Sequence, residues 1–498
     1  MAPRTKGTAA DLAWTSVFPA GERGDRLSYV EIMRAVIRAI EAGRLARGTR
    51  LPSGRDLARM LKIGRNTAML AYGGLVEQGY LVVRPRSGVV VADQMPSPAT
   101  PPAEAGEAAG PDWRGRFKIA LADDAAGAAR AGDAEPVFAF TYGQFDPSLF
   151  PTNHWRECER AALSVLEIAQ WGRDVVDEDD VELVEQLRRH ILPHHGIWAR
   201  PDEIIITLGG QQARYLVAQL LAGRGTVVGM ENPGLADFRH ILGATEAVIR
   251  ELVIDEGGLV VSEALDRCDY VYVSGGHQCP TTAVMPAERR LALLERAAAR
   301  DFIVIEDSYD NELLREPSAL AALKGLDRHQ RVIHIGSLSK LVAPGLRLGF
   351  IVAPALVIRQ VRALRRLIHR HPPGNNQRAL AIFIERGYYR GYLRRAAKAL
   401  GERSLALDAA LRRWMPDFAW RHSEGASSFW VEGPEGFDCR RIAPAAAARG
   451  VVFDAGDRFF HGPDPCRRFM RLGVSSIPAA KIDAGIRALS EAVRQCRA

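Results

Sequence analysis

A long stretch with few large apolar residues divides this chain. From Met95 to about Pro136 it reads MPSPATPPAEAGEAAGP and then continues rich in alanine and glycine. A segment of this composition buries too little apolar surface to form a core, which predicts a linker. The chain has 498 residues, whereas single cores stop growing at about 250–300 residues. We therefore expect four parts: a tail at 1–20, a first domain at 21–94, the linker at 95–135 and a second domain at 136–498.

The basic residues are concentrated in the first domain. Residues 21–90 hold 13 Lys and Arg against 6 Asp and Glu, a surplus equal to the +7 of the whole chain. Such a surplus is expected where a domain contacts a polyanion such as nucleic acid. A solvated arginine-rich surface would give the same count, so charge alone leaves both interpretations open.

Composition disfavours several classes of protein. No run approaches the roughly 20 apolar residues that a membrane span needs. The start, MAPRTKGTAADLAW, lacks the apolar core of a signal peptide. The six cysteines have no CxxC spacing, which argues against a zinc site and a disulfide framework. We expect a soluble, cytoplasmic protein with reduced thiols and no metal site.

The first domain has the pattern of a helix-turn-helix. In LPSGRDLARML, Ser53 can cap a helix, and Asp56 follows at capping-box spacing. A short glycine-containing turn at 62–64 leads to the next helix, and this arrangement is typical of a helix-turn-helix. A further helix is expected at 28–42. The inner faces of the helices would hold Ile32, Val36, Ile37, Ile40, Ala68, Ala71, Leu75 and Val76.

Two strand-like runs, YLVVR at 80–84 and SGVVV at 87–91, predict a hairpin wing with a basic tip. With the helices they resemble the winged helix-turn-helix (α+β) domain of GntR-family regulators. The resemblance implies a set of DNA-facing residues: Arg55, Arg65, Asn66 and Thr67 on the helix pair, and Arg86 and Gly88 on the wing. Gly64 departs from the usual serine cap, a substitution that costs little. A winged helix that contacts only proteins is the open alternative.

The second domain alternates apolar runs with helical stretches. Strand-like EIIIT, TVVGM, YVYVS, FIVIED and RVIHIG are interspersed with helices such as ERRLALLERAAAR. This alternation predicts an α/β domain with a largely parallel sheet. Towards the C-terminus, helix-like GYLRRAAKALGERSLALDAALRRW and strand-like SSFWVEG and FMRLGVSS predict a smaller α+β lobe.

Several residues of the second domain could hold pyridoxal phosphate. This cofactor needs an amine for a Schiff base, a cradle for its phosphate, a carboxylate for its ring nitrogen and a donor for its phenolic oxygen. Gly209, Gly210 and Gln211 open a helix, whose amides can bind phosphate. The other candidates are Asp307, Tyr309, Ser337, Ser339, Lys340 and Arg347. Each motif alone is weak, because GGQ often only starts a helix and SxSK is usually a surface segment.

The order and spacing of these motifs resemble fold-type-I aminotransferases, and more narrowly the MocR/GabR-type subfamily of GntR regulators. Members of that subfamily fuse a winged helix-turn-helix to an aminotransferase-like domain, and the resemblance covers almost the whole chain. It implies that Lys340 forms the Schiff base, Asp307 pairs with the ring nitrogen and Tyr309 meets the phenolic oxygen. It also implies that Arg347 and Ser337 hold the phosphate.

The same resemblance bears on the ligand. It implies that Arg471 binds an acidic group of an amino-acid-like effector, for which a planar guanidinium is suited. Two further segments, 375–377 and 427–430, are pocket candidates that suggest a polar effector such as taurine or an ectoine-derived diamino acid.

Three positions depart from the subfamily pattern. Leu235 stands where an aromatic ring usually stacks on the cofactor, which predicts weaker cofactor binding. Thr282 replaces a common glycine. WGRD at 171–174 stands in place of YGDP and so lacks a tyrosine that the enzymes use near the site.

Three functions fit this sequence. The first is a regulator that binds operator DNA and senses an effector through pyridoxal phosphate, as a head-to-tail homodimer and not as an enzyme. The second is a working aminotransferase with a fused DNA-binding domain, and the third is a regulator that has lost the cofactor. The winged helix and the missing YGDP favour the first over the second. Retention of Lys340, Asp307 and Arg347 disfavours the third.

Overall fold

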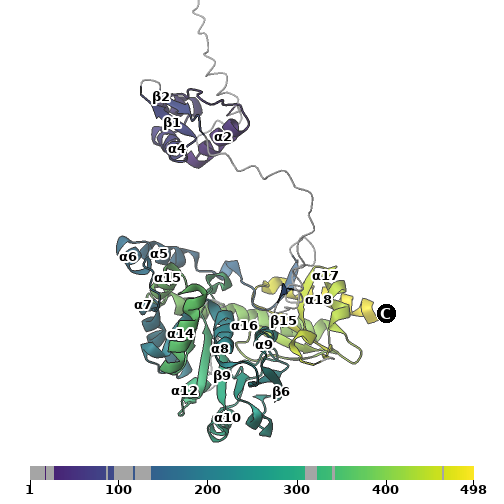
Figure 1. Cartoon of the computed structure of the whole chain (residues 1–498). Coiled ribbons are helices and arrows are strands. Elements are labelled where there is room, and N and C mark those ends of the chain that lie inside the picture. Colours follow the sequence, from purple (N-terminus) through teal and green to yellow (C-terminus); the bar gives the residue numbers. More distant parts are fainter. Residues whose placement is uncertain are drawn as a thin grey trace, which may run out of the picture. The chain divides into compact units, whose positions relative to one another are not determined.

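The structure is a computed structural model that describes the following residues: 17, 27–85, 88–94, 116–117, 136–308, 322–338, 342–462 and 465–497. The chain divides into two compact units, Met1–Lys118 and Ile119–Ala498. Figure 1 shows both units, and each has its own hydrophobic core. No helix of the described part is both long and apolar enough to cross a membrane.

The first unit contains helices and a hairpin, namely α2 (Tyr29–Glu41), α3 (Gly54–Leu61), α4 (Arg65–Glu77), β1 (Leu81–Arg84) and β2 (Gly88–Val91). Ser28 and Glu31 form a reciprocal capping box that starts α2. The expected cap of α3 is confirmed, because the hydroxyl of Ser53 accepts a hydrogen bond from the Asp56 amide at 3.2 Å.

Helices α2 and α3 both pack against α4 and close the core of this unit. Most of the apolar positions expected inside are buried: Ile32, Val36, Ile40, Ala68, Ala71 and Leu75. Ile37 and Val76 are only partly buried and lie at the edge of the core. Strands β1 and β2 pair antiparallel from Leu81↔Val91 to Arg84↔Gly88, which confirms the hairpin.

The second unit is organised around an eight-stranded sheet in the order β4-β11-β10-β9-β8-β5-β6-β7. Its strands are β4 (Ile204–Thr207), β5 (Val227–Asn232), β6 (Val248–Asp255), β7 (Gly258–Leu259), β8 (Tyr270–Val273), β9 (Ile303–Ser308), β10 (Val332–Ser337) and β11 (Gly349–Val352). The run β10-β9-β8-β5-β6 is parallel, as expected. Strand β11 is antiparallel to both β10 and β4, so β4 runs in the same direction as β10.

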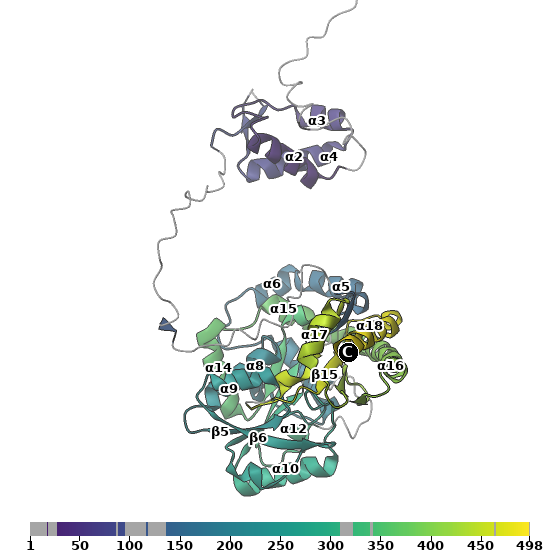
Figure 2. The same ribbon diagram turned by 90° about the vertical axis from the view of Figure 1, so that its right-hand side faces the viewer.

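Helices cover both faces of this sheet. Successive side chains of a strand point to opposite faces, so neighbouring residues pack against different helices. Ile305 packs in a core with residues of helices at 209–221, 236–243 and 355–369, whereas its neighbour Val304 packs in another core with residues of the helix at 287–300. The helices of this part are α5 (Thr152–Ala162), α6 (Val165–Trp171), α7 (Val181–Gln186), α8 (Gly209–Leu221), α9 (Ala236–Gly243), α10 (Ala287–Arg300), α12 (Leu323–Leu326), α14 (Ala355–His369) and α15 (Gly374–Glu385). Figure 2 shows α5, α6 and α15 side by side.

A smaller lobe is built on a five-stranded sheet in the order β12-β13-β15-β14-β3. Its elements are β3 (Phe138–Phe140), α16 (Tyr388–Trp414), β12 (Ala419–Arg421), β13 (Ser428–Glu432), α17 (Cys439–Ala447), β14 (Val451–Ala455), β15 (Phe469–Gly473) and α18 (Ala479–Arg497). In Figures 1 and 2, α16, α17 and α18 lie beside β15, away from α10. The expected α+β lobe is present, and it also recruits β3 from the start of the unit, parallel to β14.

The carboxyl ends of the parallel strands meet along one edge of the large sheet. Strands β4, β10, β9, β8 and β5 all end there, and α8 begins two residues after β4 ends. Open α/β sheets bind ligands at this edge.

Candidate functional site

One surface of the first unit is composed of exposed side chains from the start of α4. Arg65 and Asn66 are exposed in its first turn, Thr67 is half-buried, and Met69 is exposed one turn later. Gly64 caps this helix without a side-chain hydrogen bond. Exposed Arg and Asn can contact phosphates and base edges. The helix that was expected to face DNA thus offers a polar face with an apolar edge.

The other DNA candidates lie on α3 and the wing. Arg55 is exposed on α3. Gly88 begins β2 with a φ of +78°, a conformation that glycine adopts without strain. A Cβ atom added at Gly88 would come within 3.9 Å of Nε of Arg50, so this arginine lies close to the wing. Arg86 lies outside the described residues.

In the second unit a cavity of about 520 Å³ opens between the strand ends of the large sheet and the small lobe. We call it the arginine-lined cavity because, of the residues that the structure describes, four arginines line it. Its lining residues are Thr141, Tyr142, Gly143, Gln144, Gly209, Gly210, Gln211, Arg214, Leu235, Ala236, Asp237, Cys279, Asp307, Ser337, Pro344, Arg347, Asp454, Arg458, Phe459 and Arg471.

One end of the cavity is formed by the start of α8. Gly209 has a φ of +76°, and a Cβ atom there would lie 3.4 Å from Cζ of Arg347. Nη2 of Arg347 donates to the carbonyl of Leu208 at 2.9 Å, which keeps the guanidinium beside the helix start. The first amides of a helix and a neighbouring guanidinium both attract an anion. The structure thus brings the sequence candidates Gly209, Gly210, Gln211, Ser337 and Arg347 to one cavity.

Asp307 lines the cavity and is 2% exposed. Its Oδ2 accepts a hydrogen bond from Nη1 of Arg214 at 2.8 Å and another from the hydroxyl of Tyr272. Burial and the neighbouring Asp307 raise the pKa of Tyr272 well above its usual range, so Tyr272 stays a donor. Arg214 was missed in the sequence, although Gly210 and Arg214 are four residues apart on α8 and therefore share a face.

Arg471, on β15, also lines the cavity and is 7% exposed. Its Nε and Nη2 donate to Oδ2 of Asp454 at 3.2 and 3.1 Å. Its Cζ lies 3.8 Å from the centre of the Tyr142 ring and 4.7 Å from that of Phe459. The sequence candidate Arg471 is thus brought to the same cavity as Asp307. Its partners Asp454 and Tyr142 were not found from the sequence.

A second cation lies near Asp454. Nη1 of Arg458 is 3.6 Å from Oδ1 of Asp454, and this arginine is more exposed than Arg471. Asp454 and Arg458 are four residues apart in FDAGDRFF, at the end of β14 and in the turn of 3-10 helix that follows. One carboxylate is therefore shared by two guanidinium groups, which leaves this part of the cavity positively charged.

Three sequence candidates, Tyr309, Ser339 and Lys340, lie outside the described residues. In the sequence, Tyr309 follows the last residue of β9 and Lys340 comes three residues after the end of β10.

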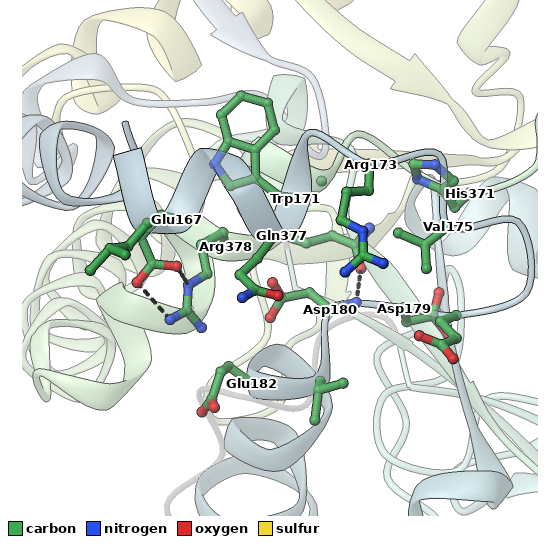
Figure 3. A pocket seen from close by; sticks show the side chains of 15 residues that line it. Glu167, Trp171, Arg173, Val175, Asp179, Asp180, Glu182, His371, Gln377 and Arg378 are labelled. Atoms are coloured by element: carbon green, nitrogen blue, oxygen red, sulfur yellow. Dashed lines mark hydrogen bonds and ion pairs between the residues drawn. The ribbon is translucent and has the colours of Figure 1, made fainter. Parts of the chain in front are cut away.

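The segments 375–377 and 427–430 do not line the arginine-lined cavity. Gln377 instead lines a second cavity of about 580 Å³, which we call the Trp171 cavity. Figure 3 shows it with Gln377 accepting from the Asp180 amide at 3.1 Å and Arg378 paired with Glu167. Phe429 and Trp430 line two further cavities. Trp430 also packs in one cluster with Cys279 and Phe459, which line the arginine-lined cavity. The effector suggestion based on those segments stays a prediction.

Comparison with known proteins gives one family match in each of the two units. The family "Bacterial regulatory proteins, gntR family" matches residues 28–91, and "Aminotransferase class I and II" matches residues 150–489. The chain is 40% identical over 463 residues to the HTH-type transcriptional regulator TauR of Rhodobacter capsulatus, covering 93% of this chain and 96% of that one. It is 28% identical over 456 residues to the probable rhizopine catabolism regulatory protein MocR of Rhizobium meliloti, covering 91% of each.

Among solved structures, the kynurenine aminotransferase of Pyrococcus horikoshii matches with a TM-score of 0.67 and 26% identity, covering 73% of this chain and 92% of that one. That structure was determined in complex with PMP. The match confirms the fold-type-I aminotransferase architecture of the second unit. The chain belongs to the MocR-type branch of the GntR family of transcription regulators, which joins a DNA-binding helix-turn-helix to an aminotransferase class I and II domain.

Proposed function

We propose that this regulator binds pyridoxal phosphate in the arginine-lined cavity, senses an amine-bearing acidic effector there, and changes its binding to operator DNA in response. The observation that carries the proposal is that one cavity combines a helix-start anion cradle, a buried carboxylate and a buried arginine. We assign DNA binding to residues 21–94, the linker to 95–135 and sensing to 136–498.

The phosphate end fits the cofactor. The amides of Gly209 and Gly210 open α8, and a larger residue at Gly209 would crowd Arg347. Ser337 ends β10 at the same cavity and can donate its hydroxyl. A phosphate dianion in this position would be stabilised by helix amides, a hydroxyl and a guanidinium together.

The ring end fits as well. The buried carboxylate of Asp307 suits a protonated ring nitrogen. Among the described residues its hydrogen bonds fall on Oδ2, so Oδ1 can accept from that nitrogen. From the sequence, Lys340 would supply the amine, with Tyr309 and Ser339 as further polar contacts. When bound, pyridoxal phosphate supplies an aldehyde carbon that forms a Schiff base with an amine.

The effector end favours an acidic group. Arg471 is buried and held by Asp454 and the Tyr142 ring, so its orientation is fixed before the ligand arrives. Arg458 adds a second positive charge at the cavity rim. Taurine has the required chemistry, because a primary amine and a sulfonate are joined by a short chain. Amino acids with a free carboxylate have it too.

A sensor needs less chemistry than an enzyme. Transamination requires a base at the ligand carbon, hydrolysis and entry of a second substrate. Sensing requires only that the bound amine persists long enough to favour one arrangement of the protein over another. The match to regulators along nearly the whole chain supports the sensor, while trace half-reaction chemistry remains compatible with it. We further propose a head-to-tail homodimer that contacts a two-part operator.

The cofactor claim can be tested with the full-length protein. Wild type supplemented with pyridoxal phosphate should develop the visible absorbance band of a lysine Schiff base, and Lys340→Ala should lack it. Lys398→Ala, which removes an exposed lysine on α16, serves as the matched control and should keep the band. Absence of the band from wild type would eliminate the cofactor part of the proposal. Its survival in Lys340→Ala would move the Schiff base to another lysine.

A further inference from the structure

The carboxylate of Asp307 is already paired with a cation of this chain. Nη1 of Arg214 donates to Oδ2 of Asp307 at 2.8 Å, and Nη2 of the same side chain donates to Oε1 of Gln211 at 2.9 Å. The Arg214 side chain is 12% exposed and that of Asp307 1%. The guanidinium is therefore fixed on two sides, and both members of the pair line the arginine-lined cavity.

This arginine remains charged throughout the physiological range. Burial lowers the pKa of Arg214, but the charge of Asp307 and the hydrogen bond that Arg214 donates to it contribute to a larger upward shift, so the net shift is upward. A charged pair at this depth is screened little by solvent. Any group that approaches Asp307 from the cavity therefore meets a carboxylate whose charge is offset by a cation at hydrogen-bond distance.

We propose that Arg214 is a positioning residue that offsets the charge of Asp307, so that the ring nitrogen of pyridoxal phosphate loses its proton more easily. An unprotonated ring favours sensing over transamination. This inference rests on the proposed binding of the cofactor in this cavity. A protonated ring nitrogen withdraws electrons from the carbon that must lose a proton in transamination. A nearby guanidinium disfavours that positive charge, as any like charge does. The carbon-bound proton of the effector amine is then retained.

A purely structural salt bridge between α8 and β9 is the competing explanation. It would contribute to stability but would leave the ring nitrogen unaffected. The position argues for more, since Nε of Arg214 is buried with no hydrogen-bond partner among the described residues. An unsatisfied buried donor costs about 1–3 kcal/mol, which reduces what the salt bridge can contribute to stability.

Spectroscopy on the full-length protein loaded with ring-labelled [15N]pyridoxal phosphate tests the inference. The 15N chemical shift reports directly whether the ring nitrogen carries a proton. We expect wild type to lose this proton as pH is raised within the range where the protein is folded. In Arg214→Met the pH midpoint for loss of the ring-nitrogen proton should rise by about one to three pH units, since a charge at this distance shifts a pKa by that amount.

Two matched variants separate charge from packing. Arg214→Lys keeps the cation and should retain the wild-type midpoint, whereas Tyr272→Phe removes a neutral donor from the same Oδ2 and should shift it less than Arg214→Met. A ring nitrogen that stays fully protonated in wild type at every pH overturns the inference even if Arg214→Met does not fold. Equal midpoints in wild type and Arg214→Met also overturn it. Failure of wild type to bind the labelled cofactor at all would instead refute the proposed function.

Discussion

Oδ2 of Asp454 accepts hydrogen bonds from both Nε and Nη2 of Arg471, at 3.2 and 3.1 Å. The pairing orients the guanidinium in the arginine-lined cavity but also offsets part of its charge. An acidic effector must therefore share Arg471 with a carboxylate of the protein, which makes Asp454 a determinant of affinity as well as of geometry.

Asp454→Asn should tighten binding of an acidic effector. Asparagine keeps an oxygen that accepts from Arg471 but removes the negative charge that faces the ligand. We expect a gain of about tenfold, or ~1.4 kcal/mol, measured by titrating the cofactor absorbance. Asp454→Ala, which also loses the orienting hydrogen bond, should gain less. Weaker binding in Asp454→Asn would show that the charge of Asp454 helps the ligand instead.

Arg65→Ala should weaken operator binding by about 1–3 kcal/mol if the side chain reads a base. Arg38→Ala removes the same charge from an exposed position on α2 and should have a smaller effect. Fluorescence anisotropy over a range of salt concentrations would measure both, because phosphate contacts make affinity fall steeply with salt. Equal affinities of Arg65→Ala and wild type would remove α4 as the recognition helix.

Leu235→Tyr should tighten binding of pyridoxal phosphate. Leu235 lines the arginine-lined cavity directly before α9, so a ring at this position can reach the cofactor face. Stacking between aromatic rings adds about 0.5–1.5 kcal/mol beyond the buried area. Leu235→Met controls for side-chain size, and equilibrium dialysis would give both dissociation constants. No difference between the two variants would mean that the missing ring has no effect.

Glu231→Gln should flatten the dependence of stability on pH. Burial, together with the charge of Asp307, raises the pKa of Glu231 from 4.5 to about 8. Between these values the folded protein holds a proton that the unfolded chain releases, so the free energy of unfolding falls as pH rises. In wild type the free energy of unfolding should fall by about 2–4 kcal/mol. Glutamine mimics the protonated acid and has no proton to release, so the fall should be smaller in the variant.

Thermal unfolding of wild type, Glu231→Gln and the exposed control Glu256→Gln at pH 5 and pH 8 would measure this. The control should follow wild type. The same change in unfolding temperature between pH 5 and pH 8 in wild type and Glu231→Gln would contradict a raised pKa of Glu231.

The sequence predicted the elements that depend on local patterns. The α4 face of Ala68, Ala71 and Leu75 follows from helical periodicity, and the parallel strands follow from short apolar runs between helices. Gly209 and Asp307 were recognised because each stands directly at the end of a strand or the start of a helix, where α/β sheets bind ligands.

What the sequence could not predict depends on contacts between distant segments. The pairing of β3 with β14 joins Phe138 to Val451, and no local pattern specifies such a partner. The bond between Arg214 and Asp307 spans 93 positions, although the spacing from Gly210 to Arg214 already placed the arginine on the cavity face of α8. Gln377 lines the Trp171 cavity, and its sequence run does not indicate which of two cavities it faces.

The most direct test of the central claim is to titrate the cofactor-loaded, full-length protein with a panel of amino sulfonates and amino acids while recording absorbance and promoter-DNA binding in the same samples. For the effector, we predict a lasting absorbance change together with altered DNA affinity, and neither in Arg471→Ala, which should keep the cofactor band and basal DNA binding. Carbonyl product should not exceed one equivalent per site. Multiple turnovers to a carbonyl product without any change in DNA affinity would contradict the sensor and establish the enzyme.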